Sequence, residues 1–362
     1  MRLNKLSLTN FRSYTKLECE FEPGVISFIG ENGAGKTNIV ESFIYLSTLS
    51  SHRVSQNQPL LQLGSEQAII RAEILNNDRK LEIDLEINTG RANRAKINSN
   101  PTKSQREILG ALQAVYFSPE DLDLVRGEPM GRRDFLDKLL VVRTPRLAGV
   151  ISDYERVVKQ RNTLLKNRAN KNTLDPWTEQ LIDFGSELTA ARIDLVNKLN
   201  PFVSEHYKSL NEVKPASISY KSNTEGISTD PQESKTALHA KSIEVAQQEL
   251  DRGASLFGPH RDDLYLHLGD FPAKGYASHG ESWSLALSLK LGSFNLLQGD
   301  GSTPILILDD VFAELDSKRR QHLISATEMA EQTFITAAVE SDLPQELITA
   351  KFYVTPGEVR RG

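Results

Sequence analysis

The stretch GENGAGKT, residues 30 to 37, has the residue types and the spacing of a phosphate-binding loop. Its glycines would let backbone N–H groups approach phosphate oxygens, the Lys36 ammonium would neutralise the β and γ oxygens, and the Thr37 hydroxyl would hold Mg²⁺. The loop follows the apolar run VISFI and precedes NIVESFIYLSTL, whose apolar spacing predicts a helix. A strand, a loop and a helix in this order predict a nucleotide site. A glycine-rich turn without a ligand is the alternative.

Two neighbouring carboxylates could complete such a site. Asp309 and Asp310 end the run ILILDD, whose four apolar residues predict a buried strand. Ligands of open α/β sheets bind at the carboxyl ends of the strands, which is where these aspartates would lie. Asp309 would support Mg²⁺, and Asp310 would orient or deprotonate the attacking water. A strand that ends in an Asp-rich turn is the alternative.

A third stretch, ASHGES at residues 277 to 282, begins like a backbone cradle for an anion. Small polar residues around Gly280 run into WSLALSLKL, which predicts a helix whose first amides could bind negative charge. The cradle contains Glu281 and has no lysine before Lys290. An ordinary N-cap and turn at Ser278 is the alternative.

The strands that must position these residues fall at both ends of the chain. Alternating or β-branched runs predict strands at residues 3–8, 25–29, 69–75, 81–87, 114–117, 264–268, 305–308, 334–335 and 352–354. Between them, apolar residues at helical spacing predict a helical hairpin whose turn is NRANKNTLDP. Residues 219 to 235 predict a long surface loop. The order of sheet, inserted helices and sheet indicates an α/β fold.

Composition limits the class of protein. With 362 residues, 39% of them hydrophobic and 25% charged, the chain can bury a sizeable core. No apolar run approaches the roughly 18 to 20 residues of a membrane span, and the start MRLNKLSLTNF lacks the apolar core of a signal peptide. The lone Cys19 favours a reducing compartment, so we expect a cytoplasmic protein. The net charge of −5 argues against a wholly basic nucleic-acid coat but leaves local patches open.

Several motifs together resemble a known family. LTNFRSY near the N-terminus, the phosphate-binding loop and LDDVFAELDSKRRQHL resemble the ATPase heads of the ABC superfamily, in its SMC-like branch. SPEDLDLVRGEPMGRRDFLD, GPHRDDL and the pairing of ASHGES with LDDVFAELD resemble the RecF family of bacterial recombination mediators. The resemblance covers nearly the whole chain. It implies an ABC-type P-loop ATPase head with an ATP-binding lobe of residues 1–118 and 290–362, a largely helical second lobe of residues 119–289 and no long coiled coil.

The resemblance also implies a composite ATP site in an ATP-dependent, head-to-tail homodimer. ATP and Mg²⁺ would bind at one subunit's phosphate-binding loop, with Thr37 and Asp309 on the metal, and a signature turn of the second subunit would close over the γ-phosphate. Ser278 and Gly280 match that turn, and AELD at residues 313 to 316 matches a loop that crosses the same interface. The expected nucleotide contacts are Gly30, Glu31, Asn32, Gly33, Ala34, Gly35, Lys36, Thr37, Asn38, Arg12, Ser278 and Gly280, and the expected catalytic residues are Lys36 and Asp310. A surface ion pair is an equal alternative for Arg12.

Departures from the family pattern predict slow hydrolysis. Glu281 stands where the signature usually has glutamine, and because a carboxylate aimed at phosphate would repel it, we expect this side chain to face the helix amides. Asp310 is one carbon shorter than the glutamate of fast ABC ATPases, Thr336 is the polar residue nearest to the usual switch histidine, and Ser118 replaces a glutamine. ATP would then act mainly as a dimerisation switch, with weak hydrolysis stimulated by DNA.

DNA is the implied partner, and local charge supports it. Between residues 126 and 171 there are twelve basic residues and five acidic ones, and GRANRAKINSNPTKSQR adds Arg91, Arg94, Lys96, Lys103 and Arg106. Such patches suit contact with the phosphate backbone, which is independent of sequence and sensitive to salt. A solvated helix face is an equal alternative for any one residue. Base-reading motifs are absent, so shape or junction recognition is favoured.

By resemblance, the protein acts in recombinational repair and replication restart and supports the SOS response. The ATP-bound dimer would clamp DNA at single-strand gaps or at junctions of single and double strands, meet the mediators RecR and RecO, and help to load the recombinase RecA. Two other classes share the ATP motifs. The basic insert and LTNFRSY disfavour the ATPase subunit of a membrane transporter, and the short helical stretch disfavours a structural SMC protein. Arg53 could contact DNA or lie in solvent. The sequence assigns no role to residues 260–263, where a Pro turn locked by ion pairs is at least as well supported as a site.

Overall fold

The computed structural model describes residues 1–76, 79–210, 213–301 and 303–362, and the chain divides into two compact units. Unit 1 comprises Met1–Asp121 and Ser293–Gly362, and unit 2 comprises Leu122–Gly292. The lobe boundaries expected from the sequence, after residues 118 and 289, lie three residues before the ends of the corresponding segments, Asp121 and Gly292. Helix α7, His279–Gly299, continues through the second boundary, so no break in the sequence pattern marks it.

Unit 1 contains two six-stranded sheets. The first is antiparallel, in the order β2-β1-β4-β5-β6-β7, with strands Tyr14–Glu20, Arg2–Phe11, Gln67–Asn76, Arg79–Asn88, Arg94–Ile97 and Asn100–Pro101. The second has the order β15-β14-β3-β13-β12-β8, with strands Glu358–Arg361, Ile348–Thr355, Gly24–Ile29, Gln332–Ala337, Ile305–Asp309 and Ala114–Phe117. In the second sheet only β15 is antiparallel to its neighbour. The carboxyl ends of β3, β13, β12 and β8 therefore share one edge.

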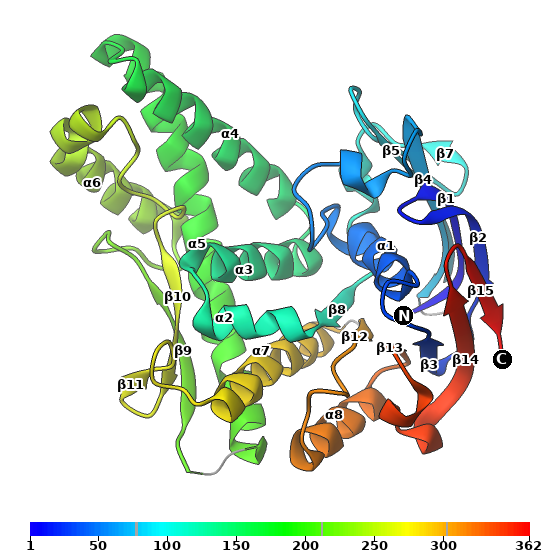
Figure 1. Ribbon diagram of the computed structural model, residues 1–362. Helices are drawn as coiled ribbons and strands as arrows, with labels where there is room; N and C mark the ends of the chain where they lie inside the picture. The colour runs from blue at the N-terminus through cyan, green and yellow to red at the C-terminus, as the bar shows by residue number, and fades with distance from the viewer. Residues whose placement is uncertain (77–78, 211–212, 302) are drawn as a thin grey trace. The chain divides into compact units, whose positions relative to one another are not determined.

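Helix α1, Lys36–Thr48, packs into the core that both sheets share, and α8, Ser317–Met329, follows β12 (Figure 1). Phe21, Phe28, Phe43, Phe334 and Phe352 form a cluster of ring contacts with centroids 4.7 to 6.1 Å apart. Aromatic pairs of this geometry each add about 0.5 to 1.5 kcal/mol beyond the buried area. The cluster joins β3, α1, β13 and β14, so it fixes the strand and the helix that flank the phosphate-binding loop.

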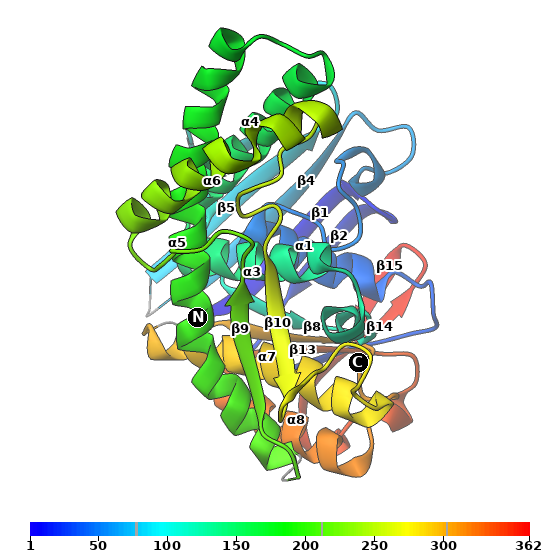
Figure 2. The same cartoon turned by 90° about the vertical axis from the view of Figure 1, so that its left-hand side faces the viewer.

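Unit 2 is largely helical. Its helices are α2 Asp123–Arg126, α3 Pro129–Arg143, α4 Leu147–Lys166, α5 Lys171–Leu210, α6 Pro231–Arg252 and most of α7. A three-stranded antiparallel sheet has the order β11-β10-β9, with strands Phe271–Pro272, Asp263–Leu268 and Ala216–Lys221. The long helix α5 packs against α4, α6 and β9 (Figures 1 and 2).

All nine predicted strands form, but two predicted connections were wrong. Helix α5 begins at Lys171, so the second half of NRANKNTLDP is helical. The loop expected at residues 219–235 is shortened by the end of β9 and the start of α6. Asp230 caps α6 by accepting from the Gln232 amide, and Pro231 occupies the first turn. Three of the five buried residues of α6 are polar, so the sequence of this helix lacks a clear apolar periodicity.

The strands that were not predicted are β2, β6, β7, β9, β11 and β15. Most are short or carry polar residues on one face, so their alternation is weak. Among the described residues, no helix is both long enough and apolar enough to cross a membrane.

Candidate nucleotide-binding site

The phosphate-binding loop connects β3 to α1 and depends on glycine geometry. Gly35 has φ of 115°, and a Cβ there would lie 2.7 Å from the Tyr14 hydroxyl and 3.0 Å from Ser13 Oγ, so only glycine fits. Lys36 is buried and donates from Nζ to the Gly30 carbonyl at 2.6 Å and to the Glu31 carbonyl at 3.2 Å. Burial lowers the pKa of Lys36, against the opposing effects of the two aspartates at residues 310 and 309. The loop thus holds an ammonium among backbone groups, as a phosphate cradle requires.

Asp309 reaches the loop from the end of β12 and is held by three hydroxyl groups. Thr336 donates to its Oδ1 at 2.5 Å, Tyr116 to its Oδ2 at 3.0 Å and Thr37 to its Oδ1 at 3.4 Å. The parallel register explains why Thr336 and Tyr116 both reach Asp309. Thr336 pairs with Asp309 itself, and Tyr116 pairs with Ile307, two residues earlier and therefore on the same face of β12. Burial raises the pKa of Asp309, and the hydrogen bonds from these hydroxyl groups oppose that rise.

Asp310 directly follows in a constrained backbone conformation. Its φ is 57°, in the left-handed region, and its N–H donates to Thr336 Oγ1 at 3.0 Å and to the Thr336 carbonyl at 3.3 Å. The Thr336 hydroxyl therefore donates to one aspartate and accepts from the backbone of the next. A non-glycine residue held in this region costs energy that the surrounding contacts must offset. Thr336 is thus a positioning residue for both carboxylates.

Sequence reasoning missed Tyr116 and His52. The Tyr116 hydroxyl lies 3.2 Å from His52 Nε2, and the two rings are 4.5 Å apart. The strand AVYF was predicted, but only its register beside β12 shows that Tyr116 faces Asp309. His52 follows α1 in the chain and has no pattern that could have revealed this contact.

The donor set at the loop fits Mg²⁺. The Thr37 hydroxyl and the Asp309 carboxylate converge beside Lys36, as expected for the metal site. Oxygen donors of this kind suit Mg²⁺, which usually keeps several waters and shares substrate phosphate oxygens. When bound, the metal would neutralise charge on the β- and γ-phosphates.

Arg12 lies in an ion pair with α1. Its guanidinium donates to both oxygens of Glu41, at 2.7 and 2.6 Å, and to the Pro59 carbonyl at 2.8 Å. Glu41 is fully buried, and Arg53 lies 3.8 Å from it while donating to Asn38 Oδ1 at 3.1 Å. Arg12 therefore forms an ion pair, as the alternative had it, but with a buried partner and not at the surface, and its nucleotide contact stays a prediction.

The signature turn, residues 278–281, begins α7 within unit 2 and forms a capping box. The Ser278 N–H donates to Glu281 Oε2 at 2.9 Å, and the Glu281 N–H donates to Ser278 Oγ at 3.2 Å. Lys214 donates to Glu281 Oε1 at 2.9 Å, and these partners lower the pKa of Glu281 to about 2, with the Lys214 hydrogen bond the largest cause. The expectation that Glu281 faces the helix amides is confirmed. The Ser278 hydroxyl thus accepts from the Glu281 N–H, and a side-chain hydrogen bond with Ser278 adds to the lowering of the Glu281 pKa.

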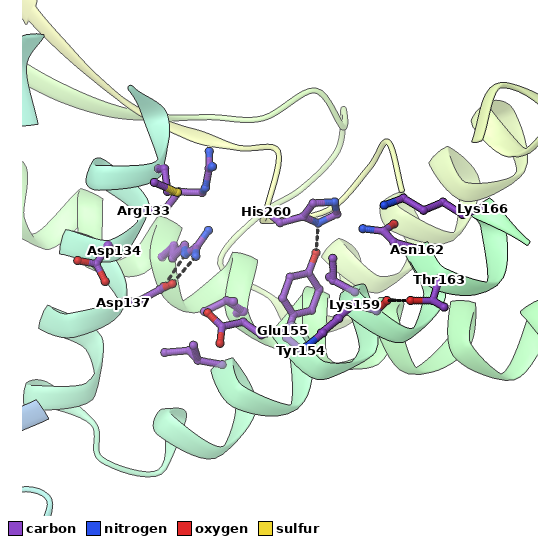
Figure 3. Close-up of a pocket in the computed structure, with 15 residues that line it drawn as sticks. Arg133, Asp134, Asp137, Tyr154, Glu155, Lys159, Asn162, Thr163, Lys166 and His260 are labelled. Atoms are coloured by element: carbon purple, nitrogen blue, oxygen red, sulfur yellow. Dashed lines mark hydrogen bonds and ion pairs between the residues drawn. The ribbon is translucent and has the colours of Figure 1, made fainter. Parts of the chain in front are cut away.

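The GPHRDD stretch forms part of a polar network in unit 2, beside a cavity of about 670 Å³ that α3, α4, α5 and His260 line (Figure 3). The Tyr154 hydroxyl lies 2.6 Å from His260 Nδ1, and His260 Nε2 lies 3.3 Å from the Ser255 carbonyl. Burial lowers the pKa of His260 to about 4, so the ring is neutral at physiological pH. A neutral ring with a proton on Nε2 donates to the carbonyl and accepts from the phenol.

Ion pairs hold the rest of this stretch. Arg192 donates to both oxygens of Asp137, at 2.8 and 2.6 Å, and to the Pro259 carbonyl at 2.7 Å. Arg132 forms a second two-bond pair with Asp263, and Asp262 accepts from Tyr220 and Ser222. These contacts tie α3, α5, β9 and β10 together. The structure therefore gives the stretch a stabilising role, the one that a turn locked by ion pairs would have.

Ion pairs with carboxylates divide the basic residues between 126 and 171 into two groups. Those paired with carboxylates are Arg132, Lys138, Arg143, Arg146, Arg156 and Arg161. Lys159 and Lys166 line the cavity in Figure 3, and neither has a carboxylate partner among the described residues. Of the six basic residues in this range without a carboxylate partner among the described residues, these two are the lysines that line the cavity, whereas Arg133 there donates to the Asp262 carbonyl.

Known proteins match this chain along its length. Residues 2–353 match the family described as the RecF/RecN/SMC N terminal domain. The protein named DNA replication and repair protein RecF of Streptomyces avermitilis is 47% identical, with all of both chains covered, and its namesake in Cutibacterium acnes is 48% identical over 99% of this chain and 98% of that one. The chain belongs to the RecF family.

Solved structures agree with RecF membership. The recombination mediator protein RecF with ATP, from the RecFOR pathway, superimposes with a TM-score of 0.90 at 27% identity, covering 99% of this chain and 97% of the other. An Smc head bound to a winged-helix domain of ScpA has a TM-score of 0.57 at 16% identity, covering 100% and 97% of the two chains, which shows a shared fold. The predicted ABC-type, SMC/RecF-like head is confirmed.

Proposed function

We propose that this RecF-family protein is an ATP-dependent DNA-binding protein of recombinational repair and replication restart, and that ATP closes it into a head-to-tail homodimer. One observation carries the dimer: Lys36, Thr37 and Asp309 converge at the loop, whereas the signature turn offers a hydroxyl and a helix N-terminus, and the lysine beside it, Lys214, is bonded to Glu281. Two half-sites of this kind complement each other across two subunits. The γ-phosphate would then be bound by one subunit's loop and by the Ser278 hydroxyl and first α7 amides of the other.

In the proposed hydrolysis, Lys36 stabilises charge on the transferred phosphoryl group and Asp310 accepts a proton from water. The water oxygen attacks the γ-phosphorus, the bond to the β–γ bridging oxygen breaks, and ADP and phosphate leave. Thr336 and Tyr116 keep Asp309 fixed during this step. Because the Asp310 side chain is short, we expect turnover well below roughly 10 per second, the median enzyme rate. ATP would serve mainly as a switch, with DNA stimulating the weak hydrolysis.

The ATP-bound dimer would clamp DNA at single-strand gaps or junctions. Lys159 and Lys166 would contact phosphates, which gives binding that depends on salt and little on sequence. The solved RecF–ATP structure comes from the RecFOR pathway, which supports RecO and RecR as partners, with RecA loading and the SOS response downstream.

Light scattering with ATP and gapped DNA tests the switch. The wild type should dimerise with ATP, Lys36→Ala should lose ATP binding, Ser278→Arg should bind ATP but stay monomeric, and Asp310→Asn should remain dimeric for longer. Monomers throughout, with wild-type DNA binding in every variant, would contradict the proposal.

The DNA contacts have a matched control on the same helix. Joint replacement of Lys159 and Lys166 by alanine should lower DNA affinity and reduce the slope of log affinity against log salt by about 1 to 2. Arg156→Ala, at a position already paired with Asp153, should change the slope less. Equal effects would refute the assignment of these lysines.

A further inference from the structure

Two exposed aromatic rings stack on each other in unit 2. Phe271 in β11 and Tyr276 in the turn before α7 are 57% and 66% exposed, and their ring centroids lie 5.4 Å apart at an interplanar angle of 27°. Large apolar side chains gathered at one exposed place are unusual in a soluble monomer and mark interaction sites. Aromatic side chains are also enriched among the residues that dominate binding energies at protein interfaces.

The stacked pair lies on the segment that leads directly into the signature turn. Phe271 pairs with Leu268 of β10, and the Ala277 N–H donates to the Ala273 carbonyl at 2.9 Å. Tyr276 precedes Ser278 by two residues, so their Cα atoms are at most about 7 Å apart. A partner that covers Ser278 would therefore lie close to the Tyr276 backbone as well.

The charges beside the pair favour a protein surface over DNA. Lys274 lies between the two rings in sequence and is bonded to Glu128 at 2.9 Å, while Lys214 is bonded to Glu281 at 2.9 Å. Each of these lysines is thus neutralised by a carboxylate, which leaves little positive charge for a phosphate backbone. An apolar centre with paired charges around it resembles the centre and rim of a protein interface.

Resting on the proposed ATP-dependent dimer, we propose that Phe271 and Tyr276 form the apolar part of its interface and pack against a second copy of this chain, beside that copy's phosphate-binding loop. The γ-phosphate bound between the two subunits would make dimerisation depend on ATP. The aromatic pair would add buried apolar area beside it. The pair would also exclude water from the closed site, which strengthens the polar contacts there.

Sedimentation of the full-length protein with ATP and without DNA tests this surface. Phe271→Ala and Tyr276→Ala should each weaken dimerisation about tenfold or more, whereas Tyr276→Phe should restore it because the ring is retained. Tyr265→Ala is the matched control, since this residue is 40% exposed on β10, about 10 Å along the strand from the Phe271 pairing position. Binding of fluorescent ATP to the monomer should be unchanged in all four variants.

The outcomes separate this inference from the proposed function. If the wild type dimerises with ATP and Ser278→Arg abolishes it, but both alanine variants dimerise normally, the aromatic surface is refuted and the switch survives. Equal weakening by Tyr265→Ala also refutes it. If the alanine variants dimerise normally but lose affinity for single-stranded DNA, the pair is a base-stacking platform and the inference is wrong. A wild type that never dimerises overturns both proposals.

Discussion

Replacing Glu281 by glutamine tests whether the carboxylate of the signature turn opposes ATP-dependent dimerisation. With a pKa of about 2, Glu281 carries its full charge at any pH where the protein is studied. A glutamine oxygen can still accept from the Ser278 N–H, so the capping box survives, and loss of the partly exposed ion pair with Lys214 should cost less than about 1 kcal/mol of unfolding free energy. The substitution therefore isolates the charge.

The size of the effect follows from Coulomb's law. A phosphate bonded to the Ser278 hydroxyl would lie roughly 6 Å from the Glu281 carboxylate, which gives a repulsion between about 0.7 and 2.8 kcal/mol for effective dielectric constants of about 80 and 20. Solvent and the Lys214 ammonium at 2.9 Å screen this repulsion, so we take about 1 kcal/mol, or roughly fivefold in affinity. Because the dimer closes two such sites, its dissociation constant should fall by about thirtyfold.

Sedimentation with ATP at low and high salt measures this constant. Lys214→Met is the complementary variant, because it removes the screening charge and should weaken dimerisation. The gain in Glu281→Gln should shrink at high salt, where exposed charges are screened. A glutamine variant that dimerises no better than the wild type, with an unchanged melting temperature, would refute the reasoning.

Three further changes test individual contacts. Thr336→Val removes the hydroxyl that holds Asp309 in place, so phosphate release should slow by about tenfold or more while fluorescent-ATP binding changes little. Arg192→Met leaves the carboxylate of Asp137 uncompensated, and urea denaturation should show a loss of about 3 kcal/mol in unfolding free energy. His260 has a folded-state pKa of about 4, below its ordinary 6.5, so the folded form binds fewer protons in that window and stability falls as pH drops from 6.5 towards 4. His260→Gln should reduce the difference between melting temperatures at pH 7 and pH 5.

Each of these three has a matched control. Thr333→Val alters a buried threonine of the same strand that does not bond to Asp309, and its phosphate release should match the wild type. Arg156→Met breaks an exposed pair and should cost less than about 1 kcal/mol. His239→Gln changes an exposed histidine outside this network and serves as the control for the substitution itself. A control that behaves like its partner variant would show that the named contact is not the cause.

The local chemistry of the site could be predicted from the sequence because it depends on contiguous residues. The phosphate-binding loop needs glycines, a lysine and a threonine at fixed spacing, and the loop forms between β3 and α1 as predicted. The orientation of Glu281 was predicted as well, since a carboxylate at a helix N-terminus gains from the amides and is repelled by phosphate. Both arguments require only the order of neighbouring residues.

Tertiary structure alone decided the contacts between distant residues. The hydrogen bonds from Tyr116 to Asp309 and between Tyr116 and His52 join positions 193 and 64 residues apart, and they depend on the register of β8 beside β12. The pairing of Arg12 with Glu41 depends on tertiary packing, because it places the Arg12 guanidinium against a fully buried side chain of α1. Residue types and spacing determined that this chain can hold a nucleotide. Which side chains hold Asp309 and Asp310 was decided by strand register, because register places residues that no local pattern connects.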